Sequence, residues 1–528
     1  MKKWRFDIFM PFLMAVYPIL FFYSINFYKI DMGDVVVTLV ISVAVAVVLL
    51  LLCRLIFRSI QRALFVSGLI LLLFYTYGHA FAVAQTFRHV RFFPFDKDPA
   101  LLAVWGALFT AGIIFAIRGE KHLPGLNRYV GMITAALAVV ALLNISVNAV
   151  TANTPEVVTV DPDFDLHAPE VLPDIYYIIL DEYAGQEELV NSLGFDNSQF
   201  LQSLEARGFY VASNSRSNYS STAFSLASSL NMGYLDSLYG HRNDDLQPLY
   251  RMIQDNRILY AVQSLGYTYI QFITNFPVTR SNPNADILFN GFDEQRIKIG
   301  DLVEIDSKLF HINDYHLTLA ETTLLRPFVS TVMLRDERIR NQANLEELVR
   351  IAQMPEATFT LAHFVLPHAP FIFTPDEGPE NPDMPVDGQV VDRDKYEPFS
   401  DYINQLIFTN RIISKVVDDI LAQSDHAPII IIQGDHGFRW LCEDCYAESK
   451  NWDDEHYYNT IQPILNVYYL PDGGSAALYP TISPVNSFRV VFDTYFGADL
   501  ELLEDRHYRP VDYYSRAYDF IDITYLGE

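Results

Sequence analysis

The feature that most constrains this chain is a series of five long apolar stretches within its first 150 residues. These stretches are Ile8–Tyr28, Val35–Cys53, Ala63–Phe87, Pro99–Ile117 and Tyr129–Val150. Each has about the 20 residues that a helix needs to cross the hydrocarbon core of a bilayer. The sequence therefore predicts a transmembrane domain of five helices over residues 1–150, and it excludes a single soluble globule.

The charges of the chain divide at the same place. Residues 1–150 contain 13 Lys and Arg against 6 Asp and Glu, whereas residues 151–528 contain 24 against 58. The acidic second part argues against nucleic acid as a partner, because such proteins present basic surfaces. With only three cysteines, the chain is not a disulfide-rich scaffold either.

The basic residues that flank the apolar stretches predict the orientation in the membrane. The flanks on the side of the N-terminus hold nine, against four on the other side, and these nine are Lys2, Lys3, Arg5, Arg54, Arg58, Arg62, Arg118, Lys121 and Arg128. Positive charges favour the cytoplasmic side, so the N-terminus is predicted to be inside. Five spans then place the rest of the chain outside, in the periplasm or the extracellular space. We expect a multi-pass protein of the plasma, or inner, membrane.

The second part of the chain is predicted to be an α/β domain. Residues 151–173 are polar and proline-containing, and are expected to form a linker to a catalytic domain over residues 174–528. Apolar runs without clean alternation, separated by helical segments, indicate a parallel sheet that is covered on both faces. The expected strands are Ile175–Leu180, Phe209–Ala212, Tyr267–Ile273, Phe359–Leu366, Pro428–Gln433 and Ile464–Leu470, and the expected helices are Asn197–Arg207, Thr222–Leu235, Leu249–Leu265 and Tyr396–Leu421.

Polar side chains follow three of these strands. Asp181 follows the first, His368 the fourth, and Asp435 and His436 the fifth. Ligands of open α/β sheets bind beyond the carboxyl ends of the strands, so we expect these residues to converge. Taken singly, each has an ordinary explanation, such as a helix cap or a buried histidine. Together, carboxylates and imidazoles are the ligands of a divalent metal.

A hydroxyl-rich segment offers a nucleophile for the same site. Residues 213–222 contain five serines and a threonine, and they lead directly into a predicted helix. Helix N-termini bind phosphate groups, although serine and threonine are also common there as simple caps. Composition leaves Ser220, Ser221 and Thr222 open as candidates.

Four short motifs resemble the sulfatase/alkaline phosphatase superfamily. They are Leu180-Asp181, the helix start Thr222-Ala-Phe-Ser-Leu226, Leu366-Pro-His-Ala-Pro-Phe371 and Gly434-Asp-His-Gly437. A five-helix anchor before such a domain is similar to lipoteichoic acid synthases and lipid A phosphoethanolamine transferases. The resemblance implies an α/β/α sandwich of the alkaline-phosphatase type with a mostly parallel central sheet.

The resemblance also implies roles for individual residues. Asp181, Thr222, Asp435 and His436 would bind one divalent cation, Zn or Mn, with a second metal left open and Glu182 as a substitute for Asp181. Thr222 would be the nucleophile that forms a phosphothreonine intermediate, and His368 would contact the transferred phosphoryl group. His363 and His456 are further candidates for substrate binding.

The expected function is that of a membrane-anchored, metal-dependent phosphoryl-group transferase. It would take a headgroup from a phospholipid or a lipid-linked donor and pass it to a glycan or lipid of the cell envelope. Two alternatives remain open: a phosphodiesterase or other hydrolase with the same site, and a non-catalytic membrane-anchored binding protein. Sulfate-ester cleavage is disfavoured, because the chain lacks the Cys/Ser-x-Pro/Ala-x-Arg motif that sulfatases need.

The segment after the Asp-His-Gly motif departs from the family pattern. The transferases usually continue with Glu and small residues, whereas this chain continues with Phe438 and Arg439. Cys442 and Cys445 follow in a Cys-x-x-Cys motif, for which a local disulfide is expected and zinc binding is the alternative. We therefore expect the acceptor side of the site to differ from that of the family.

Overall fold

A computed structural model describes residues 6–27, 30, 32–85, 98–151, 165–236, 246–274, 276, 278–280, 282–289, 296–299, 303–306, 314–375, 398–439, 453–511 and 518–527. Its contacts divide the chain into two compact units. The first unit comprises Met1–Thr154 together with His311–Met333, and the second comprises Pro155–Phe310 and Leu334–Glu528. Cys442 and Cys445 lie outside the described residues.

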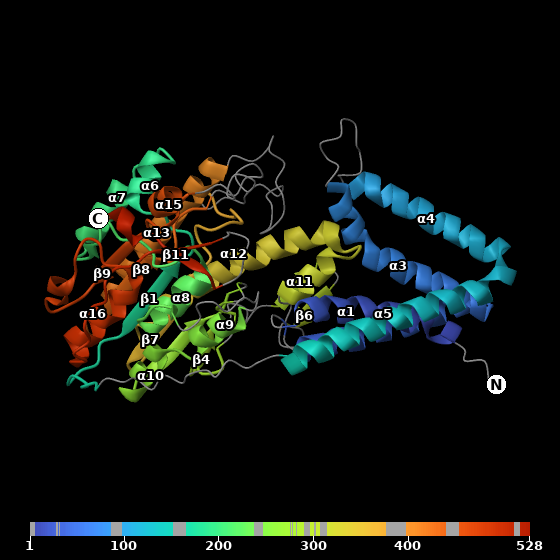
Figure 1. Cartoon of the computed structure of the whole chain (residues 1–528), viewed down its shortest axis with the longest axis horizontal. Helices are drawn as coiled ribbons and strands as arrows, with labels where there is room; N and C mark the ends of the chain where they lie inside the picture. The colour runs from blue at the N-terminus through green and yellow to red at the C-terminus, as the bar shows by residue number, and fades with distance from the viewer. Residues whose placement is uncertain are drawn as a thin grey trace. The chain divides into compact units, whose positions relative to one another are not determined.

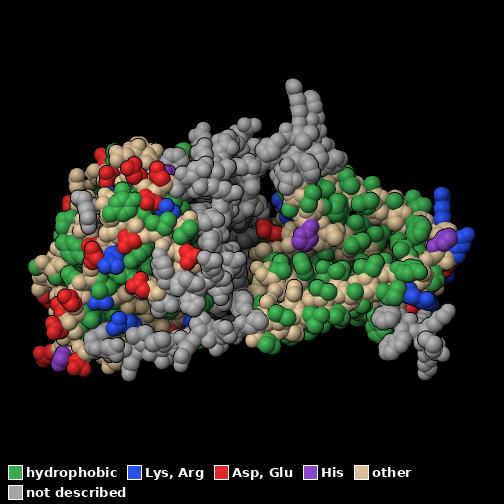
Figure 2. All heavy atoms as spheres, viewed as in Figure 1, with side chains coloured by type: hydrophobic (Ala, Val, Ile, Leu, Met, Phe, Trp, Pro, Cys, Tyr) green, Lys and Arg blue, Asp and Glu red, His purple; other side chains and the backbone are tan. Residues whose placement is uncertain are grey.

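The first unit contains five long helices, one for each predicted stretch. They are α1 (Phe6–Ile25), α2 (Met32–Phe57), α3 (Ile60–Gln85), α4 (Asp98–Arg118) and α5 (Leu123–Thr151), the last preceded by the short helix η1 (Glu120–His122). All five are long and apolar enough to cross a membrane. Large apolar side chains cover the outer face of this unit (Figure 2), with Leu55 73% and Ile56 72% exposed. Such a surface suits lipid rather than water.

A later segment of the chain returns to these helices, which the sequence analysis did not foresee. It consists of α11 (Asp314–Glu321), a turn, and the first residues of α12 (Arg326–Ile351). The Gly78 N–H donates to the Thr322 carbonyl at 3.1 Å, and the Leu324 N–H donates to the Phe74 carbonyl at 2.8 Å. A side chain at position 78 would collide with this segment, because a Cβ atom there would lie 1.9 Å from the Glu321 carbonyl oxygen. The glycine therefore permits the close approach.

An ion pair fixes the end of the same segment. Arg326 Nη1 lies 2.7 Å from Asp98 Oδ2 at the start of α4, and the guanidinium stacks over the Phe81 ring. Tyr77 donates its hydroxyl to the other Asp98 oxygen at 2.6 Å. Because the pair is only partly exposed and its carboxylate is shared, it is stronger than an ordinary surface pair.

The second unit is built on a seven-stranded sheet in the order β2-β9-β8-β1-β7-β3-β4. Its strands are β1 (Ile175–Leu180), β2 (Tyr210–Val211), β3 (Thr268–Phe272), β4 (Ile287–Phe289), β7 (Thr358–Phe364), β8 (Ile429–Gly434) and β9 (Asn466–Tyr469). Strands β8, β1, β7, β3 and β4 are parallel to one another. Strand β9 is antiparallel to β8, and β2 is antiparallel to β9. The prediction of a mostly parallel central sheet is confirmed.

Helices cover both faces of this sheet (Figure 1). Alternate side chains of β1 point to opposite faces. Tyr177 belongs to one buried cluster with residues of α8 (Thr222–Asn231), α9 (Gln247–Gln254), α10 (Arg257–Ser264) and α16 (Pro484–Phe496). Its neighbour Ile178 belongs to another, with residues of α7 (Ser198–Glu205), α12 and α13 (Pro398–Gln423). The predicted α/β/α sandwich is therefore confirmed.

Several helical segments differ from the expectation, among them α11 and α12, which were not predicted. The predicted helix Leu249–Leu265 is interrupted, because the Asn256 side chain accepts the Leu259 N–H at 2.8 Å and so caps the start of α10. Helix α16 was not predicted. The remaining elements are short: α6 (Gln186–Asn191), β5 (Arg296–Ile299), β6 (Val303–Asp306), α15 (Asp454–His456), η4 (Tyr457–Ile461), η5 (Gly474–Ala477), β10 (Tyr508–Pro510), β11 (Phe520–Asp522) and η6 (Thr524–Gly527).

Candidate metal centre

The sheet register brings the predicted strand ends to one edge. Leu180, the last residue of β1, pairs with Phe364 of β7 on one side and with Gly434 of β8 on the other. Since the three strands are parallel, the residues that follow them emerge together. Asp181 and the Asp435-His436 pair thus become neighbours, as the sequence analysis expected.

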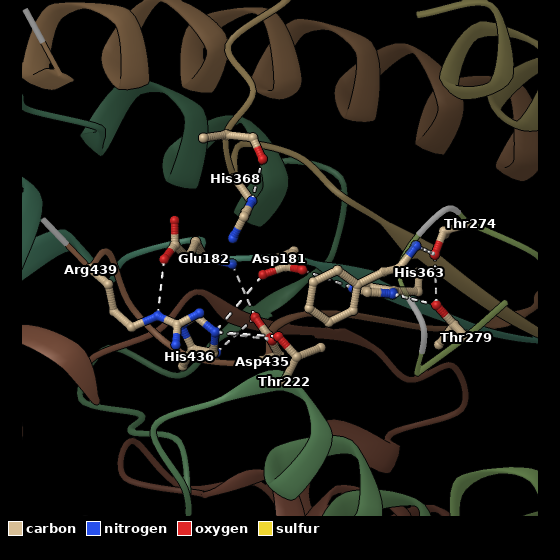
Figure 3. A network of polar contacts seen from close by, with 12 residues as sticks. Asp181, Glu182, Thr222, Thr274, Thr279, His363, His368, Asp435, His436 and Arg439 are labelled. Carbon is tan, nitrogen blue, oxygen red and sulfur yellow. Dashed lines mark hydrogen bonds and ion pairs between the residues drawn. The ribbon is translucent and has the colours of Figure 1, made fainter. Parts of the chain in front are cut away.

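Asp181, Asp435 and His436 form a compact group of potential metal ligands. One ligand atom from each lies within 4.8 Å of the others, and all three side chains are buried. His436 Nε2 lies 3.4 Å from Asp435 Oδ2 and 3.9 Å from Asp181 Oδ1 (Figure 3). Two carboxylates and an imidazole suit a divalent cation of the Zn or Mn class.

The carboxylate oxygens that face this group lack hydrogen bonds. Asp435 Oδ1 accepts the backbone N–H groups of Glu182 and His436, at 3.0 and 2.9 Å. Asp435 Oδ2 and both Asp181 oxygens are buried without a hydrogen-bond partner in the described part of the chain. Buried unpaired carboxylates are costly, and a bound cation would remove that cost. The residues present therefore fit a metal ion.

The hydrogen bond that His436 makes through Nδ1 leaves its Nε2 lone pair for metal coordination. Its Nδ1 lies 2.9 Å from the Gly437 carbonyl, which only accepts, so Nδ1 carries the proton and Nε2 the lone pair. Burial, aided by the positive charge of Arg439, lowers the pKa of His436 to about 4. At neutral pH the imidazole is therefore neutral and able to bind a metal through Nε2.

The two aspartates titrate in opposite directions. Burial and, to a lesser extent, the negative charge of Asp181 raise the pKa of Asp435 to about 7. Burial acts on Asp181 as well, but the nearby His368, His363 and His436 hold the pKa of this carboxyl below its usual range. In the metal-free protein, Asp181 is thus the carboxylate that stays ionised, and Asp435 gains a proton near neutral pH.

Thr222 reaches the group from the start of α8. Its side chain is buried, and its Oγ1 lies 3.4 Å from His436 Nε2. Against the upward effect of burial, the nearby Thr222 hydroxyl lowers the pKa of Asp435. Among the described residues, neither Ser220 nor Ser221 makes a hydrogen bond to the group, and the Ser221 side chain does not cap the helix. The geometry thus favours Thr222 of the three hydroxyls that composition left open.

His368 lies beside the three-residue group and outside it. Its Nδ1 hydrogen-bonds to the carbonyl of Ala369, and its backbone N–H donates to the Asp181 carbonyl at 3.1 Å. In Figure 3 the imidazole points toward the group with Nε2 leading. The ring is buried, so its orientation is fixed by the chain.

Glu182 and Arg439 form the wall next to His436. Arg439 Nε donates to Glu182 Oε1 at 3.1 Å, and the Glu182 side chain is fully buried. Glu182 has a φ of 60°, a left-handed conformation that is costly for a side chain of this size. Tyr402, which donates its hydroxyl to the Glu182 carbonyl at 2.8 Å, helps to hold it. Glu182 is thus occupied by Arg439 and does not replace Asp181 in the potential ligand group.

The other two predicted histidines are placed differently. His363, at the end of β7, is buried with Nε2 3.3 Å from Asp181 Oδ2. His456, in α15, is not part of the potential ligand group within the described residues. Its backbone N–H donates to the Asp453 side chain.

Sequence reasoning missed two residues that contact the site through His363. Thr279 Oγ1 lies 2.8 Å from His363 Nδ1, and Thr274 Oγ1 lies 2.9 Å from Thr279 Oγ1. Neither stands in a motif, and both belong to the loop after β3, whose path cannot be read from residue types. The one available signal was that this loop follows a strand that is parallel to β7, so that it emerges at the same edge.

Comparisons with known proteins give likenesses of fold. No model of a protein family matches the chain, and no curated protein does. The C-terminal periplasmic domain of EcEptC from Escherichia coli aligns with a TM-score of 0.42 and 11% identity, over 68% of this chain and 95% of that one. Lipooligosaccharide phosphoethanolamine transferase A (EptA) from Neisseria meningitidis aligns with a TM-score of 0.41 and 13% identity, over 92% and 95%. The putative sulfatase yidJ from Bacteroides fragilis aligns with a TM-score of 0.37 and 14% identity, over 64% and 77%. This chain is similar to these proteins, and its function is inferred from its own side chains.

Proposed function

We propose that the chain is a membrane-anchored, metal-dependent phosphoryl-group transferase of the sulfatase/alkaline phosphatase type. Its catalytic unit would act at the outer face of the membrane. The donor would be a phospholipid or lipid-linked headgroup, and the acceptor a glycan or lipid of the envelope.

One observation carries the proposal. A buried threonine hydroxyl at a helix N-terminus lies 3.4 Å from an imidazole whose lone pair faces two carboxylates with unpaired oxygens. A purely structural threonine has no need of this position. A nucleophile for phosphorus does, because the hydroxyl, the cation ligands and the helix N-terminus then act on the same phosphoryl group.

Asp181, Asp435, His436 and Thr222 would hold the cation. When bound, a cation of the Zn or Mn class lowers the pKa of a ligated hydroxyl and neutralises phosphoryl oxygen charge. The Thr222 oxygen attacks phosphorus in line, the bond from phosphorus to the leaving oxygen breaks, and a phosphothreonine forms. The nearby Asp435 carboxylate would accept the proton of the Thr222 hydroxyl.

His368 would serve the leaving group. In its protonated form Nδ1–H is held by the Ala369 carbonyl, so Nε2–H is the donor directed to the site. The leaving oxygen takes this proton. The neutral imidazole can then accept a proton from the acceptor hydroxyl, which attacks the phosphothreonine. The bond from phosphorus to the Thr222 oxygen breaks, and Asp435 returns the proton that regenerates the Thr222 hydroxyl.

The test is the intact mass of the full chain, purified in detergent with Zn²⁺ and incubated with a phospholipid. We expect a mass increase equal to the transferred headgroup phosphate, located by peptide mapping on Thr222 and absent from Thr222→Ala. A modified peptide without Thr222 would refute the nucleophile. Release of the group to water at the same rate with and without acceptor lipid would favour a hydrolase over a transferase.

A further inference from the structure

His363 lies between a hydrogen-bonded pair of threonines and the candidate metal centre. Its Nε2 lies 3.3 Å from Asp181 Oδ2, and its Nδ1 lies 2.8 Å from Thr279 Oγ1. Thr279 Oγ1 in turn lies 2.9 Å from Thr274 Oγ1, which accepts the Phe276 N–H at 3.0 Å. All three side chains are buried. In Figure 3 the two threonines lie on the far side of His363 from Asp181.

The direction of the protons in this series of contacts follows from its far end. The Phe276 N–H can only donate, so Thr274 Oγ1 accepts there, and Thr279 Oγ1 is the one acceptor among its described contacts for the Thr274 hydroxyl proton. Thr279 then donates its single proton to His363 Nδ1. The neutral imidazole must carry its proton on Nε2, which faces Asp181.

The opposite direction of hydrogen-bond donation, from His363 toward Thr274, is less favourable in free energy at both ends. If His363 donated from Nδ1 to Thr279, the Thr274 hydroxyl proton would be buried with no acceptor among its described contacts. The Nε2 lone pair would also face a carboxylate oxygen at 3.3 Å. An unsatisfied buried donor and a repulsive contact each cost free energy, and the first arrangement has neither.

We propose that His363 is a positioning residue, oriented by Thr279 and Thr274 so that its Nε2–H fixes the Asp181 carboxylate as a metal ligand. The role differs from the substrate-binding role expected from sequence, and it rests on the metal centre proposed above. Outer groups of this kind orient the ligand and set the orientation of its lone pairs, and their loss typically weakens metal binding 10- to 100-fold.

The ring of Phe276 supports the same orientation. Its centroid lies 6.0 Å from that of His363 and 6.3 Å from that of His368, in an edge-to-face arrangement with each. The loop after β3 therefore contacts His363 twice, through a hydroxyl and through an aromatic ring. Neither contact leaves the imidazole free to turn toward a substrate.

The test is Zn²⁺ affinity of the full chain in detergent, measured by competition with a chromophoric chelator. Thr279→Val keeps the shape but removes the hydroxyl, and we expect 10- to 100-fold weaker Zn²⁺ binding. Thr279→Ser keeps the hydroxyl and should bind Zn²⁺ like the wild type. Thr360→Val is the matched control, because Thr360 is buried on the same strand as His363 and its hydroxyl has no partner in the described residues; it should leave the affinity unchanged.

The outcomes separate this proposal from the proposed function. Unchanged Zn²⁺ affinity in Thr279→Val with a raised KM at saturating Zn²⁺ would overturn the positioning role in favour of substrate binding. Equal losses in Thr279→Val, Thr279→Ser and Thr360→Val would overturn it in favour of general damage. A wild-type chain that binds no Zn²⁺ would instead refute the metal centre itself.

Discussion

Thr222 Oγ1 lies 3.4 Å from His436 Nε2, although the two residues are 214 positions apart in the chain. The contact joins the start of α8 to the residues that follow β8. It places the Thr222 hydroxyl beside Nε2, the ring nitrogen of His436 whose lone pair could bind a metal. A single atom pair thus links the proposed nucleophile to the candidate metal centre.

Thr222→Ala should lower turnover by about 10³-fold or more, the scale expected when a covalent nucleophile is removed. Thr222→Ser should retain partial activity, because the hydroxyl survives and a methyl group is lost. Headgroup release from a labelled phospholipid measures both. Ser221→Ala is the control: since Ser221 makes no capping hydrogen bond, it should cost less than the ~1 kcal/mol of a typical cap and leave turnover intact.

Asp435→Ala and His436→Ala should each strip the metal from the purified protein, since each removes one of few ligands. Metal analysis after dialysis checks this. His507→Ala is the matched control, because His507 is also buried and also hydrogen-bonds to a carbonyl, that of Ser217, but within the described residues it is not part of the potential ligand group. Full occupancy in the Asp435 and His436 variants would show that the group does not bind the ion.

Metal binding should depend on pH through Asp435. Its pKa of about 7 in the metal-free protein means that a proton must leave before the carboxylate can bind a cation. Apparent Zn²⁺ affinity should therefore rise about tenfold per pH unit from pH 5 to 6.5 and level off above pH 7, because one proton is released. His436, with a pKa of about 4, adds nothing in this range. An affinity that does not change with pH would contradict the prediction.

The stability of the metal-free protein should fall with rising pH, whereas the metal affinity rises. The pKa of Asp435 is raised above its ordinary 3.8, so its contribution to folding is fully present below about pH 3.8. That contribution is lost progressively as the pH rises from about 3.8 to about 7, because over this range the unfolded state has given up a proton that the folded state still holds. Thermal unfolding with a chelator should show this loss between pH 5 and 7, and excess Zn²⁺ should abolish it.

Gly78→Ala should separate the returning segment from α3. Its Cβ atom would meet the Glu321 carbonyl oxygen at 1.9 Å, and overpacking of this kind costs about 1–3 kcal/mol. Gly106→Ala on α4 is the control, since nothing lies within 4 Å of its Cβ position and alanine favours a helix. Thermal unfolding in detergent should show a lower midpoint for Gly78→Ala only. A similar midpoint for both variants would contradict the close approach.

The predicted orientation can be checked with reporters fused after Val150. A reporter that is active only outside the cytoplasm should give signal there, because nine basic residues lie on the side of the N-terminus. A reporter that is active only in the cytoplasm should be silent at the same position. The reverse pattern would place residues after Val150 in the cytoplasm and contradict the predicted orientation.

Much of the core was predictable because its strands are uniform. Ile175–Leu180 is an unbroken apolar run in the sequence and a fully buried strand in the structure, as expected of a strand covered on both faces. Asp181, Asp435 and His436 were predictable for the same reason. A polar residue that directly follows a buried parallel strand lies at the carboxyl edge of the sheet.

The boundaries of some other helices are marked by single residues in the sequence. Ser483 precedes Pro484, and Gly497 follows Phe496, which are the start and stop signals of α16. Asn256 within an otherwise helical pattern marks the break between α9 and α10. These boundaries depend on single side chains rather than on a periodic pattern.

The loop after β3 and the returning segment had no such signal. Thr279 contacts His363 from 84 positions away, and its role depends on how one loop folds over a strand end. The sequence of α11 has no apolar stretch of transmembrane length, so nothing in its composition indicates that it packs against α1 and α3. Only the three-dimensional arrangement reveals both contacts.

The division of the first unit between Met1–Thr154 and His311–Met333 has a consequence for how the chain is made. The five long helices leave the ribosome well before the segment that packs on them, and residues 155–310 are synthesised in between. Until Arg326 has been translated, Asp98 lacks its cationic partner and Gly78 its backbone neighbour. The first unit therefore reaches its final form only after much of the second unit has been synthesised.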